Sequence, residues 1–384
     1  MEKSGSKWVA GWGAAISYVS QNHADYFRDQ TFRYVIFPTV DGSAVRLHFS
    51  NEYGTEPATV SKVVLAKRDR GEFVFPETNV RVTFGGSGEV TIPAGGSVVS
   101  DPAVFPVTAW EEFDVSLYFA GFTQLLTGHS NNGYYIKKYY GKGDWAEKAC
   151  VPLEEYGENG PYVFLNTIDF LSSSDCHSVI AFGDSITAQP WPDCLAHRIF
   201  SLGISNVSVI RKAIGGGRVL RDYRFRIKKH YGVAGIRRFE RDISQAGADR
   251  VFVLHGINDL IHPAPDSRLC PMSELPTAEE LTAGLGYYVS TARAHGMKIY
   301  LGTILPCPRC ATGEGVREKI RLAVNDWIRN SSGCDGVIDF ERAVWDPADH
   351  SRMLPEYDSG DHLHPSFAGA AHMAESIPVE FITG

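Results

Sequence analysis

The first part of the chain, to about residue 170, alternates apolar and polar side chains in short runs. Residues 44–49 and 113–119 show the pattern clearly, because every second side chain in each run is strongly apolar. A two-residue period is typical of strands that bury one face. Turn-forming sequences such as 39–42 and 85–88 separate the runs. This part therefore predicts an all-β sandwich, with a jelly roll as the expected arrangement.

The second part of the chain follows a different pattern, in which short continuous apolar runs alternate with longer amphipathic ones. The apolar runs include residues 251–254, 298–303 and 336–339. Helical periodicity is found at residues 277–295 and 316–330. Buried strands that alternate with helices predict a doubly wound α/β fold with a parallel sheet.

A short polar segment at residues 171–175 lies between the two patterns. We therefore expect two domains, a β-sandwich domain at residues 1–170 and an α/β domain at residues 171–384. The length of 384 residues exceeds one ordinary domain. A hydrophobic content of 43% with 21% charged residues is typical of a globular protein that buries a sizeable core.

A serine stands at the point where the first strand of the α/β part is expected to end. The sequence Phe-Gly-Asp-Ser-Ile-Thr at 182–187 follows the apolar run 178–181 and interrupts it with a glycine. A serine at a strand-to-helix turn exposes its hydroxyl beside unpaired backbone N–H groups, which can bind a developing oxyanion. Ser185 is therefore a candidate nucleophile. The alternative is a plain turn in which the serine only caps the following helix.

Asp361 and His364, near the end of the chain, supply the two other groups that a serine nucleophile needs. A neutral imidazole accepts the hydroxyl proton, and a carboxylate fixes the imidazole tautomer and stabilises its charged form. Pro365 disfavours helical torsions at the residue before it, so both side chains should lie on a loop before a helix at 366–375. The alternatives are a polar loop that caps this helix and a metal site that includes His362.

Two further segments are centred on glycine and follow apolar runs: Ile-Gly-Gly-Gly-Arg at 214–218 and Gly-Ile-Asn-Asp at 256–259. Each is expected at the carboxyl end of a strand, where ligand sites of parallel sheets form. A glycine N–H and the Asn258 amide can bind an oxyanion there. A phosphate-binding loop is the alternative at 215–217, but the glycine spacing of such loops and a following Gly-Lys-Ser/Thr are absent from this sequence.

These motifs, taken in order, resemble those of the SGNH hydrolase superfamily, also called the GDSL esterases and lipases. The resemblance runs from Ser185 to His364, and the sequence at 357–365 is typical of two-domain bacterial and fungal members, which are often secreted. It implies that Ser185 is the nucleophile and that His364 is the general base, oriented by Asp361.

The resemblance also implies an oxyanion hole made of Gly216, Asn258 and the backbone N–H of Ser185. One position departs from the pattern of the superfamily. Gly217 stands where an asparagine usually follows the glycine, which leaves a neighbouring glycine as an alternative donor.

Other residues near the motifs have weaker claims to a role. Four side chains are candidates for substrate contacts, although each could equally pack or brace a loop: Trp191, Arg218, His255 and His262. Asp184 and Asp259 adjoin two of the motifs, and we interpret them as hydrogen-bonding groups that brace the loops.

The implied reaction is hydrolysis of an ester by acyl transfer, with a small-molecule or glycan ester as substrate and no cofactor or metal. Because many members with a β domain act on acetylated carbohydrates, the resemblance favours a carbohydrate O-acetylesterase. A short-chain lipolytic esterase or lysophospholipase is the runner-up. The alternative outside the enzymes is an inert carbohydrate-binding protein that holds glycan on aromatic side chains such as Trp110, Tyr134 and Tyr135.

Charge restricts the partners. A formal net charge of −8 argues against nucleic-acid and membrane-surface binding, and no segment is apolar for long enough to insert into a membrane. The stretch 211–241 differs from the rest of the chain, because it is rich in arginine and lysine and poor in acids. We expect a solvated face there, with a subunit contact or a site for an anionic substrate group as alternatives. If the stretch is a subunit contact, the protein is a homo-oligomer.

The seven cysteines are irregularly spaced and odd in number, which favours a reducing compartment over a disulfide framework. Cys307 and Cys310 form a single Cys-x-x-Cys, for which zinc binding and a redox pair are minor alternatives. Residues 8–19 are mildly apolar, but Gly11 and Gly13 interrupt them and no convincing cleavage site follows. We expect a cytoplasmic protein, or a secreted one from which a leader has been removed.

Overall fold

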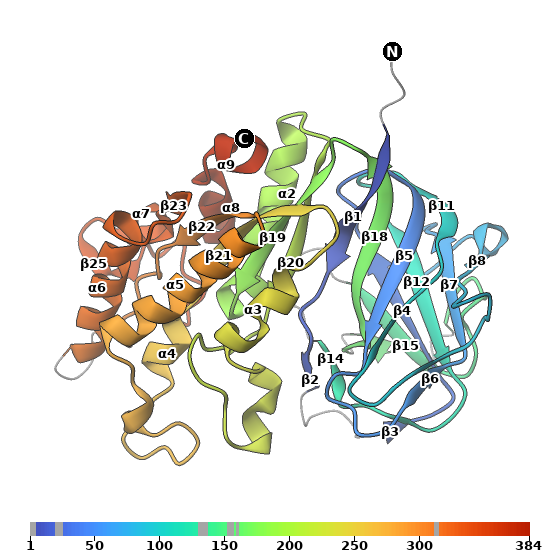
Figure 1. Cartoon of the computed structure of the whole chain (residues 1–384), viewed down its shortest axis with the longest axis horizontal. Coiled ribbons are helices and arrows are strands. Elements are labelled where there is room, and N and C mark those ends of the chain that lie inside the picture. The colour runs from blue at the N-terminus through green and yellow to red at the C-terminus, as the bar shows by residue number, and fades with distance from the viewer. Residues whose placement is uncertain (1–4, 20–25, 130–136, 152–156, 159–160, 311–314) are drawn as a thin grey trace. The chain divides into compact units, whose positions relative to one another are not determined.

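The computed structural model divides into two compact units, Met1–His177 and Ser178–Gly384 (Figure 1). The described residues are 5–19, 26–129, 137–151, 157–158, 161–310 and 315–384. Tyr134 and Tyr135, named above as aromatic candidates, lie outside them. The polar segment 171–175, expected to link the domains, ends a strand at Ser173 and then forms a turn.

The two largest sheets of the first unit are antiparallel. The strands of one sheet follow the order β1 (Ser6–Gly13), β18 (Leu165–Ser173), β5 (Gly42–Ser50) and β10 (Ser97–Val99), with β11 (Ala103–Val107) also paired to β5. The order in the other sheet is β16 (Gly157–Glu158), β15 (Lys138–Lys142), β4 (Gln30–Ile36), β12 (Phe113–Phe119), β7 (Lys62–Lys67) and β8 (Val80–Arg81).

Alternating side chains from both sheets meet in one apolar core. Val45, Leu47 and Phe49 of β5 enter it from one side, and Val115 and Leu117 of β12 enter it from the other. This arrangement confirms the predicted β sandwich, since a two-residue period places every second side chain on the inner face. Shorter strands complete the unit: β2 (Ser17–Tyr18), β3 (Tyr26–Phe27), β6 (Ala58–Val60), β9 (Val90–Ile92), β13 (Thr123–Gln124), β14 (Thr127–His129) and β17 (Tyr162–Val163), with the 3₁₀ turn η1 (Pro76–Thr78).

The second unit is built on a five-stranded sheet. Its order is β20 (Val207–Ala213), β19 (His177–Gly183), β21 (Ala248–Leu254), β22 (Lys298–Gly302) and β23 (Gly336–Ile338). The pairs β19–β21, β21–β22 and β22–β23 are parallel. This is the flavodoxin-like order, in which the chain turns in opposite directions on either side of the first strand. The predicted doubly wound α/β fold is confirmed.

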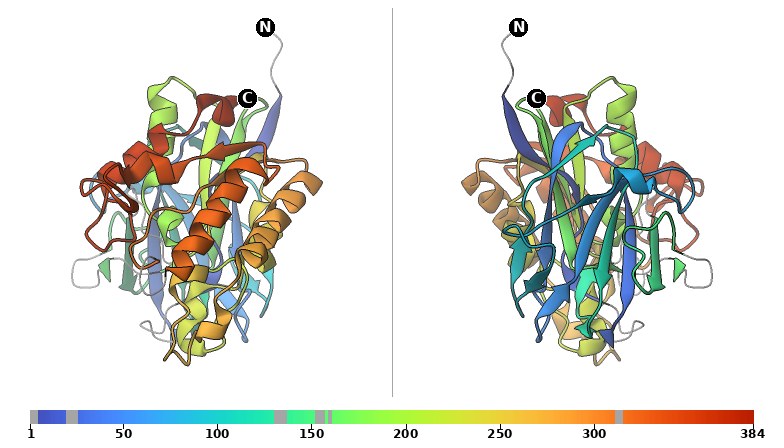
Figure 2. Two further views of the ribbon diagram at one scale, coloured as in Figure 1. Left: turned by 90° about the vertical axis from the view of Figure 1, so that its left-hand side faces the viewer. Right: turned by 90° about the vertical axis from the view of Figure 1, so that its right-hand side faces the viewer.

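Helices pack in two groups against this sheet. Helix α3 (Gly235–Ile243) contacts α5 (Ala278–Ala294), which lies beside α6 (Val316–Asn330), whereas α2 (Trp191–Ser201) packs against α8 (Phe367–Glu375) (Figures 1 and 2). The shorter elements are α1 (Ser185–Ala188), α4 (Ile257–Ile261), α7 (Phe340–Val344), α9 (Val379–Thr383), η3 (Arg226–Tyr231), η4 (Met272–Glu274), β24 (Trp345–Asp346) and β25 (Asp349–Met353).

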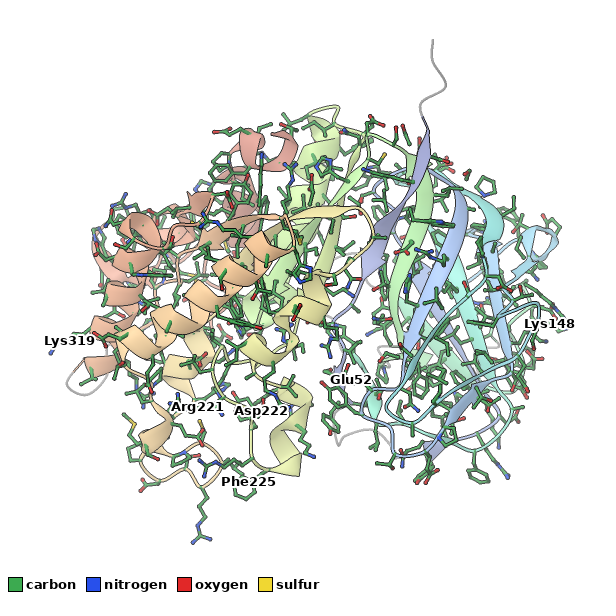
Figure 3. All side chains as sticks on the ribbon, in the orientation of Figure 1. Glu52, Lys148, Arg221, Asp222, Phe225 and Lys319 are labelled. Atoms are coloured by element: carbon green, nitrogen blue, oxygen red, sulfur yellow. The ribbon has the colours of Figure 1, made fainter. Side chains whose placement is uncertain are left out.

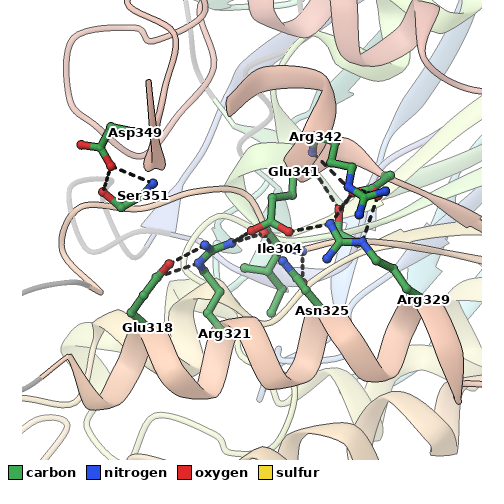
Figure 4. A network of polar contacts seen from close by, with 11 residues as sticks. Ile304, Glu318, Arg321, Asn325, Arg329, Glu341, Arg342, Asp349 and Ser351 are labelled. Atoms are coloured by element: carbon green, nitrogen blue, oxygen red, sulfur yellow. Dashed lines mark hydrogen bonds and ion pairs between the residues drawn. The ribbon is translucent and has the colours of Figure 1, made fainter. Parts of the chain in front are cut away.

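Helix α6 is tied to neighbouring segments by buried charges (Figure 4). The guanidinium of Arg321 is fully buried and bonds Glu318 and Glu341. Asn325 accepts the N–H of Ile304 at 2.8 Å and donates to its carbonyl at 2.9 Å. Because buried charges and amides are stable only when their hydrogen bonds are complete, this network fixes the segment that follows β22.

The basic stretch 211–241 is a solvated face only in part, since Arg224 and Arg237 are exposed and other cations are not. Four of its cations are buried: Arg211, Lys212, Arg218 and Arg238. Arg211 pairs with Asp193 and Arg218 with Glu274, each at 2.7 Å. These carboxylates lie outside the stretch, so its own sequence could not indicate the pairing. Arg224 and Phe225 are exposed. Figure 3 shows Phe225 below Arg221 and Asp222.

Candidate active site

Ser185 lies directly after the carboxyl end of β19, as the first residue of α1. The strand ends at Gly183, where a Cβ would lie 2.1 Å from the carbonyl oxygen of Leu254, so only glycine fits. Asp184 then caps the short helix, because its carboxylate accepts the N–H of Ile186 at 3.0 Å. The sharp turn leaves the Ser185 side chain half-buried beside the sheet edge.

The structure brings the three residues of the predicted triad into one hydrogen-bonded line. Nε2 of His364 lies 2.8 Å from Oγ of Ser185, and Nδ1 of His364 lies 2.6 Å from Oδ2 of Asp361. Both distances are those of good hydrogen bonds. The imidazole therefore has one nitrogen on the carboxylate and the other on the hydroxyl, as a base that takes a proton from serine requires.

The Asp361 carboxylate is held by its own loop. Its Oδ1 accepts the N–H groups of Leu363 at 3.0 Å and His364 at 2.8 Å, and the hydroxyl of Ser359 at 3.1 Å. Partial burial opposes ionisation, but the hydrogen bonds, led by the one with the His364 ring, hold the pKa of Asp361 well below its usual range. Asp361 is therefore a carboxylate whenever the imidazole can act as a base.

The second histidine of the loop points to a different carboxylate. Nδ1 of His362 lies 2.7 Å from Oδ2 of Asp358, and its side chain is 68% exposed. The backbone of His362 has a positive φ of 60°, which lies in the left-handed region and is uncommon for residues other than glycine. The two histidines thus bind separate carboxylates. Among the described residues, no group of three or more His, Cys, Asp or Glu side chains is arranged to hold a metal ion.

The glycine-rich segment after β20 forms a tight turn next to the serine. The N–H of Gly217 donates to the carbonyl of Ile214 at 3.0 Å, and Gly216 has φ of 77°, as in type II turns. A Cβ on Gly215 would lie 3.7 Å from Cβ of Ser185, which places this turn beside the hydroxyl. Since the Gly217 N–H is already bonded within the turn, Gly216 is the better candidate for an outward-facing donor.

Asn258 lies at the end of β21, in the first turn of α4. It is 2% exposed, and its Nδ2 donates to the carbonyl of Gly217 at 3.0 Å. An amide nitrogen carries two hydrogens, so a second one is available beside the glycine turn. The bond to Gly217 fixes the direction of both.

The expected loop-bracing roles of Asp184 and Asp259 are confirmed. Oδ2 of Asp259 accepts the N–H of Val219 at 2.7 Å and Oδ1 accepts that of Leu220 at 3.1 Å. Burial raises the pKa of Asp184 to about 7 and that of Asp259 to about 6. Both carboxyls lie within the fold and bond backbone N–H groups rather than the reacting centre.

Three of the four candidate substrate contacts have side chains that are buried and already bonded, as in the alternative of packing or bracing a loop. Trp191 is fully buried and packs on Phe340 with ring centroids 5.4 Å apart. Arg218 is 2% exposed and ion-paired with Glu274. His255 is 2% exposed, its Nδ1 lies 3.1 Å from the Tyr288 hydroxyl, and burial lowers its pKa to about 3.

The fourth candidate, His262, is half-buried and belongs to an aromatic group that the motifs do not indicate. Its ring stacks on Tyr231 with centroids 5.6 Å apart, and its Nδ1 contacts the hydroxyl of Tyr223. A Cβ on Gly216 would lie 2.4 Å from the Tyr231 ring, so these aromatic side chains lie against the glycine turn.

Sequence reasoning also missed a buried arginine behind the serine turn. Arg238 donates through Nη2 to the carbonyl of Gly183 at 2.8 Å and through Nη1 to that of Lys212 at 3.0 Å. Asp242 neutralises it at 2.7 Å. The spacing of Arg238 and Asp242 by four residues on one helix was the only available signal of this pair.

The cysteines stay apart from this site chemistry. All seven are free thiols. Cys307 and Cys310 are both buried, and the hydrogen bond from the Cys310 thiol lowers the pKa of Cys307 to about 7.

Comparison with known proteins identifies the family of the second unit. A sequence model of the GDSL-like Lipase/Acylhydrolase family matches residues 181–372, which is half of the chain. The chain belongs to this family. The match confirms the resemblance drawn from the motifs, and the chain is a carboxylic ester hydrolase. The alternative of an inert carbohydrate-binding protein is therefore set aside.

Several solved structures are similar to the chain, and each covers about half of it. An acetylxylan esterase from Geobacillus stearothermophilus is 18% identical, covers 53% of this chain and 94% of its own, and has a TM-score of 0.39. A GDSL-like lipase from Bacteroides thetaiotaomicron is 15% identical, covers 53% of this chain and 87% of its own, and has a TM-score of 0.38. An α/β hydrolase from the metagenome of Lake Arreo, Spain, is 16% identical, covers 54% of this chain and 95% of its own, and has a TM-score of 0.40.

A search of curated proteins gives no match to the chain. Within the described part of the chain, none of the helices has the length and apolar character needed to cross a membrane.

Proposed function

We propose that the chain hydrolyses acetyl esters of carbohydrates by transferring the acyl group to Ser185. The observation that carries the proposal is the position of the His364 ring, 2.8 Å from the Ser185 hydroxyl and 2.6 Å from the Asp361 carboxylate. His364 is the general base in this scheme, and Asp361 orients it. A serine hydroxyl is a weak nucleophile until such a base removes its proton.

The reaction has two similar halves. Oγ of Ser185 attacks the ester carbonyl while His364 takes its proton, and the same proton then goes to the departing alcohol oxygen as the C–O bond breaks. Water attacks the acyl-enzyme in the second half, with His364 again accepting a proton and returning it to Ser185. The Asp361 carboxylate stabilises the imidazolium in both halves and stays ionised throughout.

Each half passes through a tetrahedral oxyanion that needs hydrogen-bond donors. We assign these to the backbone N–H of Ser185, the backbone N–H of Gly216 and the second Nδ2 hydrogen of Asn258. The bond from Asn258 to the Gly217 carbonyl supports this assignment, since it joins two of the donors in one rigid unit. Preorganised donors act without further reorganisation when charge develops.

The aromatic side chains beside the glycine turn support a sugar as the alcohol part of the ester. Tyr231 and His262 are half-buried and stack on each other next to Gly216. Rings that combine an apolar face with a polar edge suit a molecule with C–H and O–H groups on its surface.

A short-chain lipolytic esterase or lysophospholipase is the second candidate. The ring of Phe367, three residues after His364 in the chain, is 54% exposed. An exposed phenyl ring close in sequence to the base favours an apolar acyl or alkyl group on the substrate.

A substrate panel separates the two candidates. We would measure kcat/KM for p-nitrophenyl esters from acetate to decanoate, and for acetylated xylan, acetylated mannan and simple sugar acetates. The proposal expects kcat/KM to be highest for acetate among the aryl esters, with acetate release from at least one carbohydrate. Preference for octanoate or longer chains, with no release from any sugar acetate, would favour the lipolytic candidate instead.

A further inference from the structure

The hydroxyl of Tyr223 has two partners next to the proposed oxyanion hole. It donates to the carbonyl oxygen of Gly216 at 2.7 Å, and it contacts Nδ1 of His262. We propose that Tyr223, with His262 behind it, is a positioning residue that fixes the direction of the Gly216 N–H. This inference rests on the proposed function, because it assumes that the Gly216 N–H binds the oxyanion formed at Ser185.

Glycine has no side chain to restrict its backbone rotation, so a hydrogen bond to the Gly216 carbonyl is needed to hold the peptide in one orientation. The peptide that joins Gly216 to Gly217 is held at both ends. Its N–H bonds the carbonyl of Ile214 at 3.0 Å, and its C=O bonds Tyr223 at 2.7 Å. With this peptide fixed, the direction of the Gly216 N–H depends on φ and ψ of Gly216.

Tyr231 limits that remaining rotation. A Cβ on Gly216 would lie 2.4 Å from the Tyr231 ring, so the ring packs closely over the α-carbon. Tyr231 also contacts Tyr223 edge to face, with centroids 5.2 Å apart. The turn is thereby enclosed by a hydrogen bond on one side and an aromatic ring on the other. A peptide held in this way can keep its N–H directed at the reacting centre.

The direction in which the Tyr223 hydroxyl donates determines the role of His262. A phenol has one hydrogen, and here it goes to the Gly216 carbonyl. The contact with His262 is then a hydrogen bond only if Nδ1 carries a proton and donates to the phenol oxygen. A chain of donors from His262 through Tyr223 to Gly216 follows, and each bond in such a chain strengthens the next.

The Tyr223 ring is itself held in place by Arg218, which packs on its face. The Arg218 guanidinium lies 4.2 Å from the ring centroid, and it is fixed by Glu274 at 2.7 Å and by the carbonyl of Asp222 at 2.8 Å. Tyr223 is 6% exposed, and burial raises its pKa. The hydroxyl therefore keeps its proton and acts as a donor at neutral pH.

The main test is Tyr223→Phe, which keeps the ring on Arg218 and removes both hydrogen bonds. We expect kcat for p-nitrophenyl acetate to fall about 10- to 100-fold, because a small displacement of a catalytic group has a cost of this size. KM should change less than about threefold, since the ground-state ester carries no oxyanion. Affinity for phenylboronic acid, which forms a tetrahedral adduct with a nucleophilic serine, should fall with kcat.

The matched control is Tyr34→Phe in the β-sandwich unit. Tyr34 is also buried, and its hydroxyl bonds the carbonyl of Pro161 at 3.3 Å and the N–H of Val163 at 2.7 Å. Its removal should lower the melting temperature and leave kcat and boronate affinity unchanged. If Tyr223→Phe behaves in the same way, with kcat within twofold of the parent, the proposal is wrong.

Variants of His262 keep the proposal testable if Tyr223→Phe does not fold. The amide nitrogen of asparagine takes the position of Nδ1, so His262→Asn should retain most of kcat, whereas His262→Ala should lose about as much as Tyr223→Phe. Equal activity of both His262 variants with the parent would contradict the proposed chain. Failure of the proposed function is recognised separately, because Ser185→Ala would then remain active.

Discussion

Nε2 of His364 lies 2.8 Å from Oγ of Ser185, although the two residues are 179 positions apart in the chain. The packing of two helices produces this proximity. Helix α8, which follows His364, packs against α2, which follows Ser185. Arg198 of α2 joins them by donating to the carbonyls of Ala374 and Ile377 at 2.8 and 2.5 Å. The contact between α2 and α8 thus holds the proposed base next to the nucleophile.

Replacement of Asp361 by asparagine should separate the role of its carboxylate from that of the loop. An amide can donate to the wrong imidazole nitrogen and cannot stabilise the imidazolium, so kcat for p-nitrophenyl acetate should fall roughly 1000- to 10,000-fold. KM should change much less.

The neighbouring pair in the same loop provides the control for this measurement. His362→Ala removes a side chain that is 68% exposed and bonded to Asp358, and it should leave kcat nearly unchanged. His364→Ala should be at least as damaging as Asp361→Asn. An inactive His362→Ala enzyme beside a fully active His364→Ala enzyme would show that the base has been assigned to the wrong histidine.

The Asn258→Ala variant should lose an oxyanion donor and the bond to the Gly217 carbonyl. Loss of one such donor costs about 100- to 1000-fold in kcat. Steady-state kinetics on p-nitrophenyl acetate would measure the loss, with the circular dichroism spectrum as a check on folding. A folded variant whose kcat stayed within threefold of the parent would remove Asn258 from the oxyanion hole.

Stability should depend on pH through the buried Asp184. Its pKa is about 7 in the folded protein, against about 4 in the unfolded chain, because burial disfavours the charged form. The folded state therefore binds more protons than the unfolded state between these values. The contribution of Asp184 to the free energy of unfolding should fall as pH rises from about 4 to 7.

Asp184→Asn keeps an oxygen that can accept the Ile186 N–H and removes the titration. The difference in free energy of unfolding between variant and parent, from urea melts at several pH values, should grow in favour of the variant from pH 4 to 7. His255, whose pKa is about 3 in the folded protein, contributes a slope of opposite sign over about pH 3 to 6.5, so only the difference is diagnostic. A constant difference would contradict the assignment.

Trp191 should be important for stability rather than for substrate binding. It is fully buried, packs on Phe340, and its Nε1 lies 3.4 Å from the Thr187 hydroxyl. Trp191→Phe should lower the free energy of unfolding by about 1–3 kcal/mol through lost volume and a lost hydrogen bond. KM for p-nitrophenyl acetate should be unchanged in the folded variant, and a KM raised tenfold would restore Trp191 as a substrate contact.

The architecture could be predicted because it depends on local patterns. The alternation at 113–119 became strand β12, and the helix predicted at 316–330 is α6 with the same bounds. Ser185, Asp361 and His364 could be selected because their chemistry is tied to a glycine turn and a proline-limited loop. Their meeting still required the packing of α8 on α2, which no local pattern contains.

The sequence could not predict the directions in which the side chains near the motifs point. Arg218 follows a motif glycine directly, yet its partner Glu274 lies 56 residues further along the chain and draws the guanidinium into the fold. Trp191 likewise turns inward because α2 buries its first turn. Tyr223 stands in a basic stretch with no motif of its own, so only the folded chain places its hydroxyl on Gly216.

Covalent labelling tests the central claim most directly. A fluorophosphonate reacts with a serine only where a base activates the hydroxyl and donors bind the phosphonyl oxygen, so the labelled residue marks the nucleophile. We would treat the folded protein with the reagent and map the adduct by peptide mass spectrometry. The account predicts a single adduct on Ser185 that is absent from Ser185→Ala and accompanies complete loss of ester hydrolysis. An adduct on another residue, or hydrolysis that persists in Ser185→Ala, would contradict it.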